Sequence, residues 1–291
     1  MAIALAAALW AVAASVARNL FDSGVPPIEL VQARALIGAV GLGLIPGAWR
    51  QAAKGAGSAS WFHVVGLGLS IAAVNAAYYL AIERLAVAVA IVLQYTAPAL
   101  VVAWVAVRTR RRPETVVLVA LFGAVAGVVL ASELLAGDIG TLDGVGIALG
   151  LAAAVMFATY TLLSQSVAAA YGPLGALARA FAVAALVWIV FQIPRGVPES
   201  LIERANIPEV LFVGIAGTIL PFILYLWGIT KVAAERAAIA ATLEPVLAGV
   251  VAWIWLGQTL SPMQLAGGAL ALGAVGMLQA RRREAVAPPD L

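Results

Sequence analysis

The segment Tyr78–Leu100, with the sequence YYLAIERLAVAVAIVLQYTAPAL, matches the segment Tyr225–Leu247, YLWGITKVAAERAAIAATLEPVL, when the two are aligned on Pro98 and Pro245. Four further positions keep their residue or their charge: Arg84 aligns with Lys231, Ala86 with Ala233, Ala90 with Ala237 and Leu100 with Leu247. We infer that two distant parts of the chain repeat one structural unit. A chance match between alanine-rich helices is the alternative.

The composition of the chain is that of a membrane protein. Of its 291 residues, 64% are hydrophobic and only 11% are charged, and the mean hydropathy is +1.05. An ordinary soluble domain is roughly a quarter charged. A membrane-spanning helix needs about 20 mostly apolar residues, and short connections with helix breakers such as Gly172-Pro173 separate runs of this kind. The runs predict an all-α membrane protein with ten spans, at residues 2–21, 27–48, 60–82, 85–107, 115–135, 143–169, 173–193, 209–230, 234–256 and 262–280.

Five of these spans fall in each half of the chain. Ala33-Arg34-Ala35 in the second span matches Ala178-Arg179-Ala180 in the seventh, which supports a repeat over the whole half. An odd number of spans per unit places the second unit upside down relative to the first. We therefore predict two inverted five-helix repeats, residues 1–137 and 138–283, followed by a disordered tail at 284–291. Inverted repeats with a central site are typical of secondary transporters.

The distribution of Lys and Arg predicts the orientation. With a cytoplasmic N-terminus, the inner loops hold eleven basic residues and the outer loops hold three. The loop between the fifth and sixth spans carries Glu133, Asp138 and Asp143 with no basic residue, as is typical of an outer loop. We predict a multi-pass protein of the bacterial inner membrane with both termini in the cytoplasm.

The composition also excludes several classes of site. The chain has no cysteine and one histidine, His63, so it cannot form disulfides, zinc-cysteine sites, iron–sulfur clusters or histidine-rich metal sites. Neither a metal nor a cofactor is predicted. The isoelectric point near 9.5 does not indicate nucleic-acid binding, because the basic residues form short clusters between apolar runs. The apolar N-terminus has no preceding Lys or Arg, which favours a first span over a cleaved signal peptide.

Glu244 is the only acidic residue deep within a predicted span. A charge at that depth costs about 2.5–3.5 kcal/mol on insertion scales, so the side chain should face a cavity, be paired or be protonated. It is a candidate contact for a proton or for a substrate amine. The alternative is a packing hydrogen bond beside Pro245, whose missing N–H leaves a carbonyl free.

Arg34 and Arg179 lie six or seven residues from the ends of their predicted spans. Long arginine side chains can extend to the lipid headgroups, which is one explanation for both. Alternatively, one of the two holds a substrate carboxylate or pairs with Glu244. Of the two we assign Arg179 to the substrate site.

Uncharged polar and aromatic residues recur on single helix faces and should face the interior of the bundle, because a hydroxyl or amide in hydrocarbon needs a partner. A cavity of this kind suits a zwitterion with an apolar or aromatic side chain. Packing between helices is the alternative. The predicted lining residues are Trp10, Asn75, Tyr78, Gln94, Tyr95 and Tyr160.

Two further patterns concern helix geometry. Pro98 and Pro245 each remove a backbone hydrogen bond and kink their helices, and we predict that they are hinges; static bends are the alternative. Gly123-xxx-Gly127 and Ala269-xxx-Gly273 favour close helix contact, either within the scaffold or in a dimer. The chain is expected to be a monomer or a weak homodimer.

The second half resembles the EamA-type unit of the drug/metabolite transporter superfamily, and the first half resembles it more loosely. Trp10-Ala11 lies where that family has Trp-Gly, and Arg34 where it has an arginine. Gln258 stands where the family commonly has Glu, and the corresponding end of the fourth span is Arg108. The residues that carry the resemblance in the second half are Gly217-Thr218, Tyr225, Ala233 to Ala238, Leu243-Glu244-Pro245-Val246, Leu256-Gly257, Ser261-Pro262, Gln264 and Gly267-Gly268.

The resemblance implies ten helices as two five-helix units, and its similarity to the YddG-type exporters implies export of amino acids, aromatic ones included. The expected partners are a small-molecule substrate and the lipid bilayer, with a proton as candidate coupling ion. An integral-membrane enzyme is the main rival, but it would need clustered acids, histidines or a nucleophile–base pair at membrane depth. Export of drug-like or other metabolites is the alternative within the fold. No channel filter sequence is present.

Overall fold

The computed structural model describes residues 1–49, 60–85, 87–132, 135, 143–196, 198–201, 203–256 and 259–286. Every regular element within these ranges is a helix. The first half contains α1 (Ala2–Asp22), α2 (Pro27–Leu44), α3 (Trp61–Ile82), α4 (Val87–Gln94), α5 (Ala97–Thr109) and α6 (Thr115–Ala131). The second half contains α7 (Gly144–Gln192), α8 (Ile207–Gly214), α9 (Leu220–Ile229), α10 (Ala234–Ala241), α11 (Leu243–Leu256) and α12 (Pro262–Val286). Three short elements complete it: η1 (Ile193–Arg195), η2 (Glu199–Leu201) and the π-helical η3 (Ile215–Ile219).

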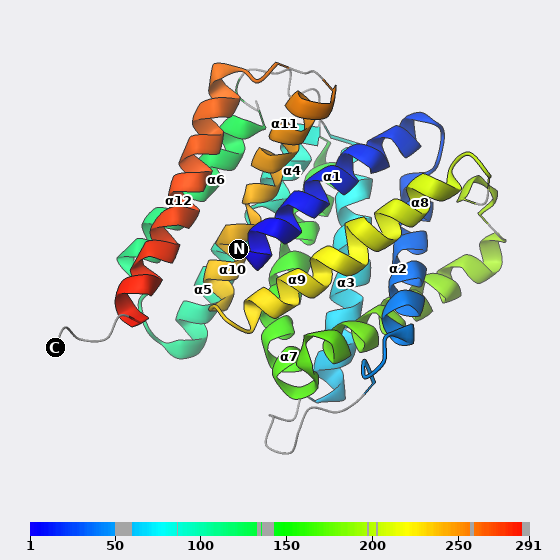
Figure 1. Ribbon diagram of the computed structural model, residues 1–291, viewed down its shortest axis with the longest axis horizontal. Coiled ribbons are helices and arrows are strands. Elements are labelled where there is room, and N and C mark those ends of the chain that lie inside the picture. Colours follow the sequence, from blue (N-terminus) through cyan, green and yellow to red (C-terminus); the bar gives the residue numbers. More distant parts are fainter. Residues whose placement is uncertain are drawn as a thin grey trace.

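The longest element, α7, is two helical arms joined at a bend. Gly172 has φ 70° and ψ 164°, a conformation open to glycine, and Pro173 follows it. The predicted break at Gly172-Pro173 is therefore confirmed. Figure 1 shows the two arms diverging from this bend. Asp143 begins the first arm as its N-cap, accepting a hydrogen bond from the Gly146 amide at 2.9 Å.

Two helical elements are interrupted beside the aligned prolines. The α4–α5 break lies at residues 95–96, where the Thr96 hydroxyl donates to the Leu93 carbonyl at 2.6 Å. The α10–α11 break lies at Thr242, whose hydroxyl donates to the Ile239 carbonyl at 2.7 Å. Pro98 and Pro245 thus sit in the first turn of the following helix, where a proline costs no helical hydrogen bond. The interruption precedes each proline, in place of the predicted kink, and the role of hinge stays a prediction.

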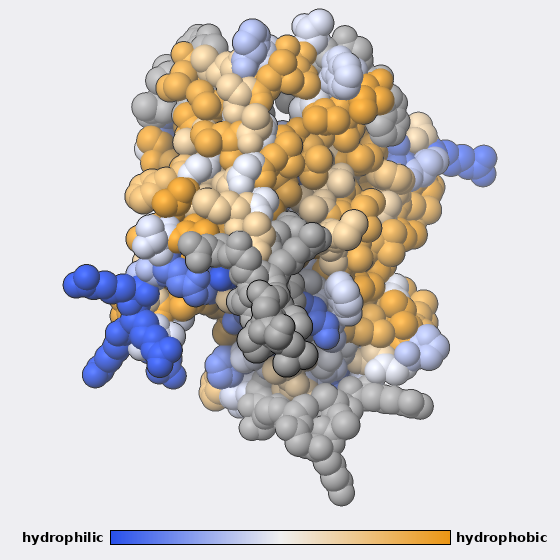
Figure 2. Space-filling model, turned by 60° about the vertical axis from the view of Figure 1, so that its left-hand side comes forward, coloured by the Kyte–Doolittle hydropathy of each residue, from blue (hydrophilic) through white to orange (hydrophobic). Residues whose placement is uncertain are grey.

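Six of the described helical stretches are long and apolar enough to cross a membrane, and Thr115–Ala131 and Pro262–Leu278 are shorter apolar helices. Figure 2 shows a face covered mainly by hydrophobic residues, with the hydrophilic ones gathered toward its margins. Large side chains such as Phe122 and Val107 are 72% and 76% exposed. A soluble monomer rarely exposes apolar area on this scale, whereas lipid contact requires it.

Helices α6 and α12 lie side by side (Figure 1) and touch through small residues. A Cβ added at Gly127 would lie 2.8 Å from the Gly267 carbonyl oxygen and 2.9 Å from the Ala271 amide nitrogen. The predicted close contact at Gly127 is therefore made inside the scaffold. Its partner face differs from the expected one, because Ala269 is exposed and a Cβ added at Gly273 would meet no described atom within 4 Å.

Two predicted boundaries fall at the edges of the described residues. Residues 284–286, the first residues of the predicted tail, lie at the end of α12. Residues 287–291 lie outside the described residues. The predicted boundary between residues 137 and 138 also lies outside them, and so does Gln258.

Candidate functional site

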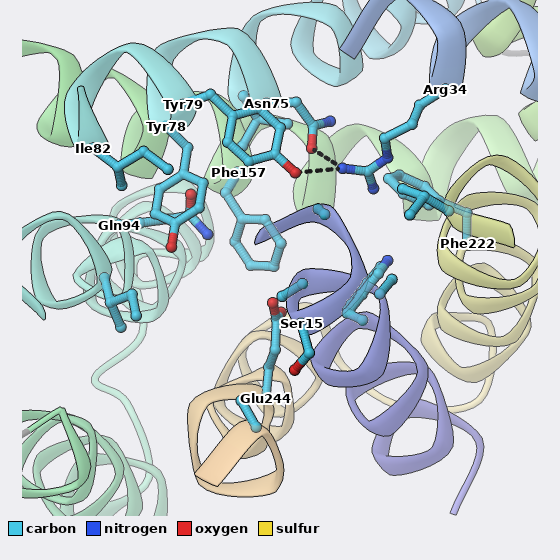
Figure 3. A pocket seen from close by; sticks show the side chains of 18 of the residues that line it. Ser15, Arg34, Asn75, Tyr78, Tyr79, Ile82, Gln94, Phe157, Phe222 and Glu244 are labelled. Atoms are coloured by element: carbon cyan, nitrogen blue, oxygen red, sulfur yellow. Dashed lines mark hydrogen bonds between the residues drawn. The ribbon is translucent and has the colours of Figure 1, made fainter. Parts of the chain in front are cut away.

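A cavity of about 490 Å³ lies among α1, α2, α3, α4, α7, α8, α9 and α11 (Figure 3). Its walls are mostly apolar and aromatic, with a few polar groups, as in typical small-molecule sites of about 300–1,000 Å³. Six of the eight predicted binding residues line it: Trp10, Asn75, Tyr78, Gln94, Tyr160 and Glu244. The structure thus brings together side chains from five helices that are far apart in the sequence.

Tyr95 stands behind Glu244. It is 5% exposed and does not line the cavity, but its hydroxyl donates to Glu244 Oε2 at 2.8 Å. The interruption between α4 and α5 places Tyr95 on the irregular turn, and Glu244 lies in the first turn of α11 after the matching interruption. The two broken helices therefore meet through this hydrogen bond at the cavity wall.

Arg179 lies away from the cavity. Its Nη1 donates to the carbonyls of Gly175 at 3.0 Å and Ala48 at 3.2 Å, and its Nη2 donates to the Trp49 carbonyl at 3.0 Å. Its guanidinium also lies over the Tyr171 ring, 4.4 Å from the centroid. The side chain ties the residues after α2 to the start of the second arm of α7. The structure does not bring Arg179 to the predicted substrate site.

Arg34 lines the cavity in its place. It is 9% exposed, and its Nε donates to Thr218 Oγ1 at 2.9 Å. Its Nη1 donates to Asn75 Oδ1 at 3.3 Å and to Tyr79 Oη at 3.0 Å, as Figure 3 shows. Its Nη2 donates to the Gly217 carbonyl at 3.3 Å. The guanidinium is therefore fixed by acceptors from α3 and η3.

The π-helical turn η3 supplies two of these acceptors. Thr218 donates to the Val213 carbonyl, five residues earlier, at 2.9 Å, and this bond leaves its hydroxyl oxygen free to accept from Arg34. A Cβ added at Gly217 would lie 2.4 Å from the Ala13 Cβ, so glycine lets α1 pack closely against this turn. Insertions of this type occur frequently at functional sites. No pattern in the sequence indicated it.

A cluster of aromatic rings forms one wall. Trp10 packs edge-on against Phe222 with ring centroids 5.5 Å apart, and Tyr160 stacks on Tyr225 at the same distance. Tyr225 is fixed by a 3.1 Å hydrogen bond with Thr161. Contacts of this kind add to the stability gained from burial.

Two buried polar atoms of the wall have no hydrogen-bond partner among the described residues, namely Tyr160 Oη and Gln94 Oε1. Both residues line the cavity. These two atoms are themselves buried, although other atoms of the same side chains line the cavity.

Several lining residues were not predicted from the sequence. Phe157 lies three residues before Tyr160 on the same face of α7, and Phe222 lies between Thr218 and Tyr225 on one stripe. Helical spacing from the chosen polar residues would have found both. Ser15, whose hydroxyl donates to the Ala11 carbonyl at 3.3 Å, gave no signal because serine is common in membrane helices.

Comparison with known proteins finds similar membrane transporters. The threonine/homoserine exporter RhtA of Escherichia coli (strain K12) is 34% identical over 209 residues, which are 72% of this chain and 66% of that protein. The RhtA exporter of Salmonella typhimurium (strain LT2) is 31% identical over 75% of this chain and 71% of that protein. The uncharacterized inner membrane transporter YicL of the same strain is 27% identical over 72% and 70%. The alignment thus spans slightly less than two thirds of the first exporter.

A solved crystal structure of another protein shares the fold. It superimposes with a TM-score of 0.77 over 98% of both chains at 20% sequence identity. In addition, the sequence model of the EamA-like transporter family matches residues 1–133 and 144–279. These two matched stretches cover most of the chain, and the chain is therefore a helical membrane protein that belongs to the EamA-like transporter family.

Proposed function

We propose that this protein is a secondary exporter of small amphipathic metabolites, namely amino acids (aromatic and other neutral ones), that works by alternating access. One observation carries the proposal: a single cavity combines a buried arginine, a glutamate and an aromatic wall. These groups suit a zwitterion with an apolar or short polar side chain. The two exporter relatives, whose names give threonine and homoserine as substrates, support the amino-acid class.

The helices are consistent with ten spans in two inverted units. The bend at Gly172 divides the longest stretch, Gly144–Arg195, into two arms, α6 and α12 supply the shorter spans, and α10 with α11 supplies one more. The two stretches matched by the family, 1–133 and 144–279, support repeats at 1–137 and 138–283. Both termini are proposed to be cytoplasmic on the basis of the loop charges.

In this topology the cavity faces the outside. Its lining residues on α1 run from Trp10 to Phe21, and those on α3 run from Val74 to Ile82, which are the outward ends of the two helices. Arg179 lies at the opposite end, where α2 finishes and α7 bends. The pair of sequence-equivalent arginines thus occupies different surroundings, Arg34 at the cavity and Arg179 in a closed contact. Exchange of these two arrangements would turn the cavity to the inside.

Purified protein in proteoliposomes should catalyse saturable counterflow of labelled L-threonine or L-phenylalanine when the lumen holds the unlabelled amino acid. The reason is that a carrier exchanges solute through one site that faces each side in turn. Protein-free liposomes are the control. Solute passage without saturation would indicate a channel, chemical consumption of the solute would indicate an enzyme, and counterflow restricted to drug-like cations would replace the proposed substrate class.

Arg179→Ala should shift the protein toward an inward-open state, because it removes three hydrogen bonds and two ring contacts at the closed end. The chain has no cysteine, so single cysteines report accessibility cleanly. We expect labelling of Ala176→Cys, buried in the present structure, to rise from the cytoplasmic side. Labelling of Ala14→Cys, at the cavity, should fall from the outside.

Arg195→Ala is the matched control, because this arginine also lies over a ring, that of Phe191 at 3.7 Å, but outside the contact that closes the inner end. Labelling at both reporter positions should stay at the parental level. Equal labelling in Arg179→Ala and its parent would show that the Arg179 contact does not control access.

A further inference from the structure

We propose that Arg34 binds the carboxylate of the transported solute, so that the site selects molecules with a free carboxylate. This inference rests on the proposed function and names the substrate group that its cavity recognises. It reverses the assignment made from the sequence, in which Arg179 held that role.

Arg34 forms none of the ion pairs that can be described, and Glu244, which lines the same cavity, is the acid whose charge acts on it. The four hydrogen bonds of Arg34 go to two hydroxyls, one amide oxygen and one backbone carbonyl, all of them neutral. Arg84–Asp143 and Arg236–Glu114 are ion pairs of other arginines, both away from the cavity. A buried cation in apolar surroundings is stabilised strongly by an anion. The cavity is the place from which an anion can reach it.

The guanidinium is arranged to accept such an anion. The hydrogen bonds occupy four of its five N–H groups, and an N–H on Nη2 has no protein acceptor among the described residues. The acceptors come from α3 and η3 and hold the guanidinium in one orientation. Binding to a group that is already oriented loses little side-chain entropy, which favours affinity.

Glu244 supplies the opposite charge. Its Oε2 accepts from Tyr95, and it reaches the cavity from α11, whereas Arg34 comes from α2 (Figure 3). A solute with a carboxylate at one end and an ammonium at the other matches this pair. The aromatic rings of Phe157 and Phe222 lie in the same cavity and can accommodate the side chain.

The test compares each amino acid with two derivatives that lack the carboxylate charge. Competition against the labelled amino acid measures the binding of each compound. The compounds are L-threonine and L-phenylalanine, their methyl esters, and the corresponding amines without the carboxylate, 1-amino-2-propanol and phenethylamine. In the wild type the acids should bind about tenfold or more tighter than the esters and amines, since a hydrogen bond to a charged group is lost. In Arg34→Gln this difference should fall to about twofold or less.

Arg34→Lys and Arg236→Gln complete the set. Lysine keeps the charge among the same acceptors, so the preference for acids must persist even if Arg34→Gln fails to fold. Arg236 pairs with Glu114 outside the cavity, and its glutamine variant must keep the full wild-type preference. Two results would show that Arg34 does not bind the carboxylate: an unchanged preference for the acids in Arg34→Gln, or the loss of this preference in a folded Arg34→Lys. In either case, the proposed function stands as long as the wild type binds the acids. If the wild type binds none of the acids, both fail together.

Discussion

Glu244→Gln should reduce pH-gradient-driven uptake of a labelled amino acid into proteoliposomes to the level of protein-free liposomes, while exchange of the same amino acid continues. Glutamine keeps the size of the side chain and an oxygen that can accept from Tyr95, but it cannot release a proton. Glu244 lines the cavity, where the solute and a proton could compete for it. A carboxylate at membrane depth is a candidate proton carrier for this reason.

Tyr95→Phe and Glu203→Gln are the matched controls. Tyr95→Phe removes the hydroxyl that donates to Glu244 and keeps the ring, so driven uptake should weaken without disappearing. Glu203 is exposed, and its glutamine variant should behave as the wild type. Undiminished driven uptake by Glu244→Gln would exclude this residue both as the proton site and as a charged contact for the solute ammonium.

The parts of the fold that could be predicted from the sequence are those with a local cause. Apolar runs mark helices, and Gly172-Pro173 marks the bend in α7 because neither residue suits a helix interior. Polar side chains within apolar runs, such as Asn75 and Gln94, were predicted to face the interior, and both line the cavity. They must face the interior, since lipid offers them no partner.

The parts that could not be predicted depend on how the two halves differ. Arg34 and Arg179 occupy equivalent positions in sequence, yet one lines the cavity and the other is bound to backbone carbonyls. Sequence similarity alone cannot distinguish two sites whose surroundings are set by the conformation of the whole molecule. The π-helical turn at Thr218 has a similar origin, because it is stabilised by Arg34 from another helix.

At the α6–α12 contact, too, the sequence alone could not predict which small residues face each other. The spacing in Gly123-xxx-Gly127 predicted a contact and Gly127 makes one, but the facing residues are Gly267 and Ala271. Both faces of α12 carry small residues, so spacing alone could not select between them. A Cβ added at Gly273, on the other face, would meet no described atom within 4 Å.

Gly267→Ala should therefore destabilise the protein strongly, whereas Gly273→Ala should not. A Cβ at Gly267 would lie 2.5 Å from the Ala131 amide nitrogen and 2.6 Å from the Gly127 carbonyl oxygen. These are backbone atoms, so α6 and α12 must separate, and overpacking of this kind costs about 1–3 kcal/mol. We expect a clear fall in the melting temperature of the detergent-solubilised protein. The melting temperature is measured by size-exclusion chromatography of samples heated to increasing temperatures.

Gly273→Ala makes the same chemical change on the same helix in open space, and there the gain in helix propensity, about 1 kcal/mol or less, acts alone. Its melting temperature should equal or exceed that of the wild type. The two variants thus separate contact with α6 from the effect of alanine on the helix itself. Equal melting temperatures for both would mean that α6 and α12 do not pack through Gly267, and the arrangement of the two helices would have to be revised.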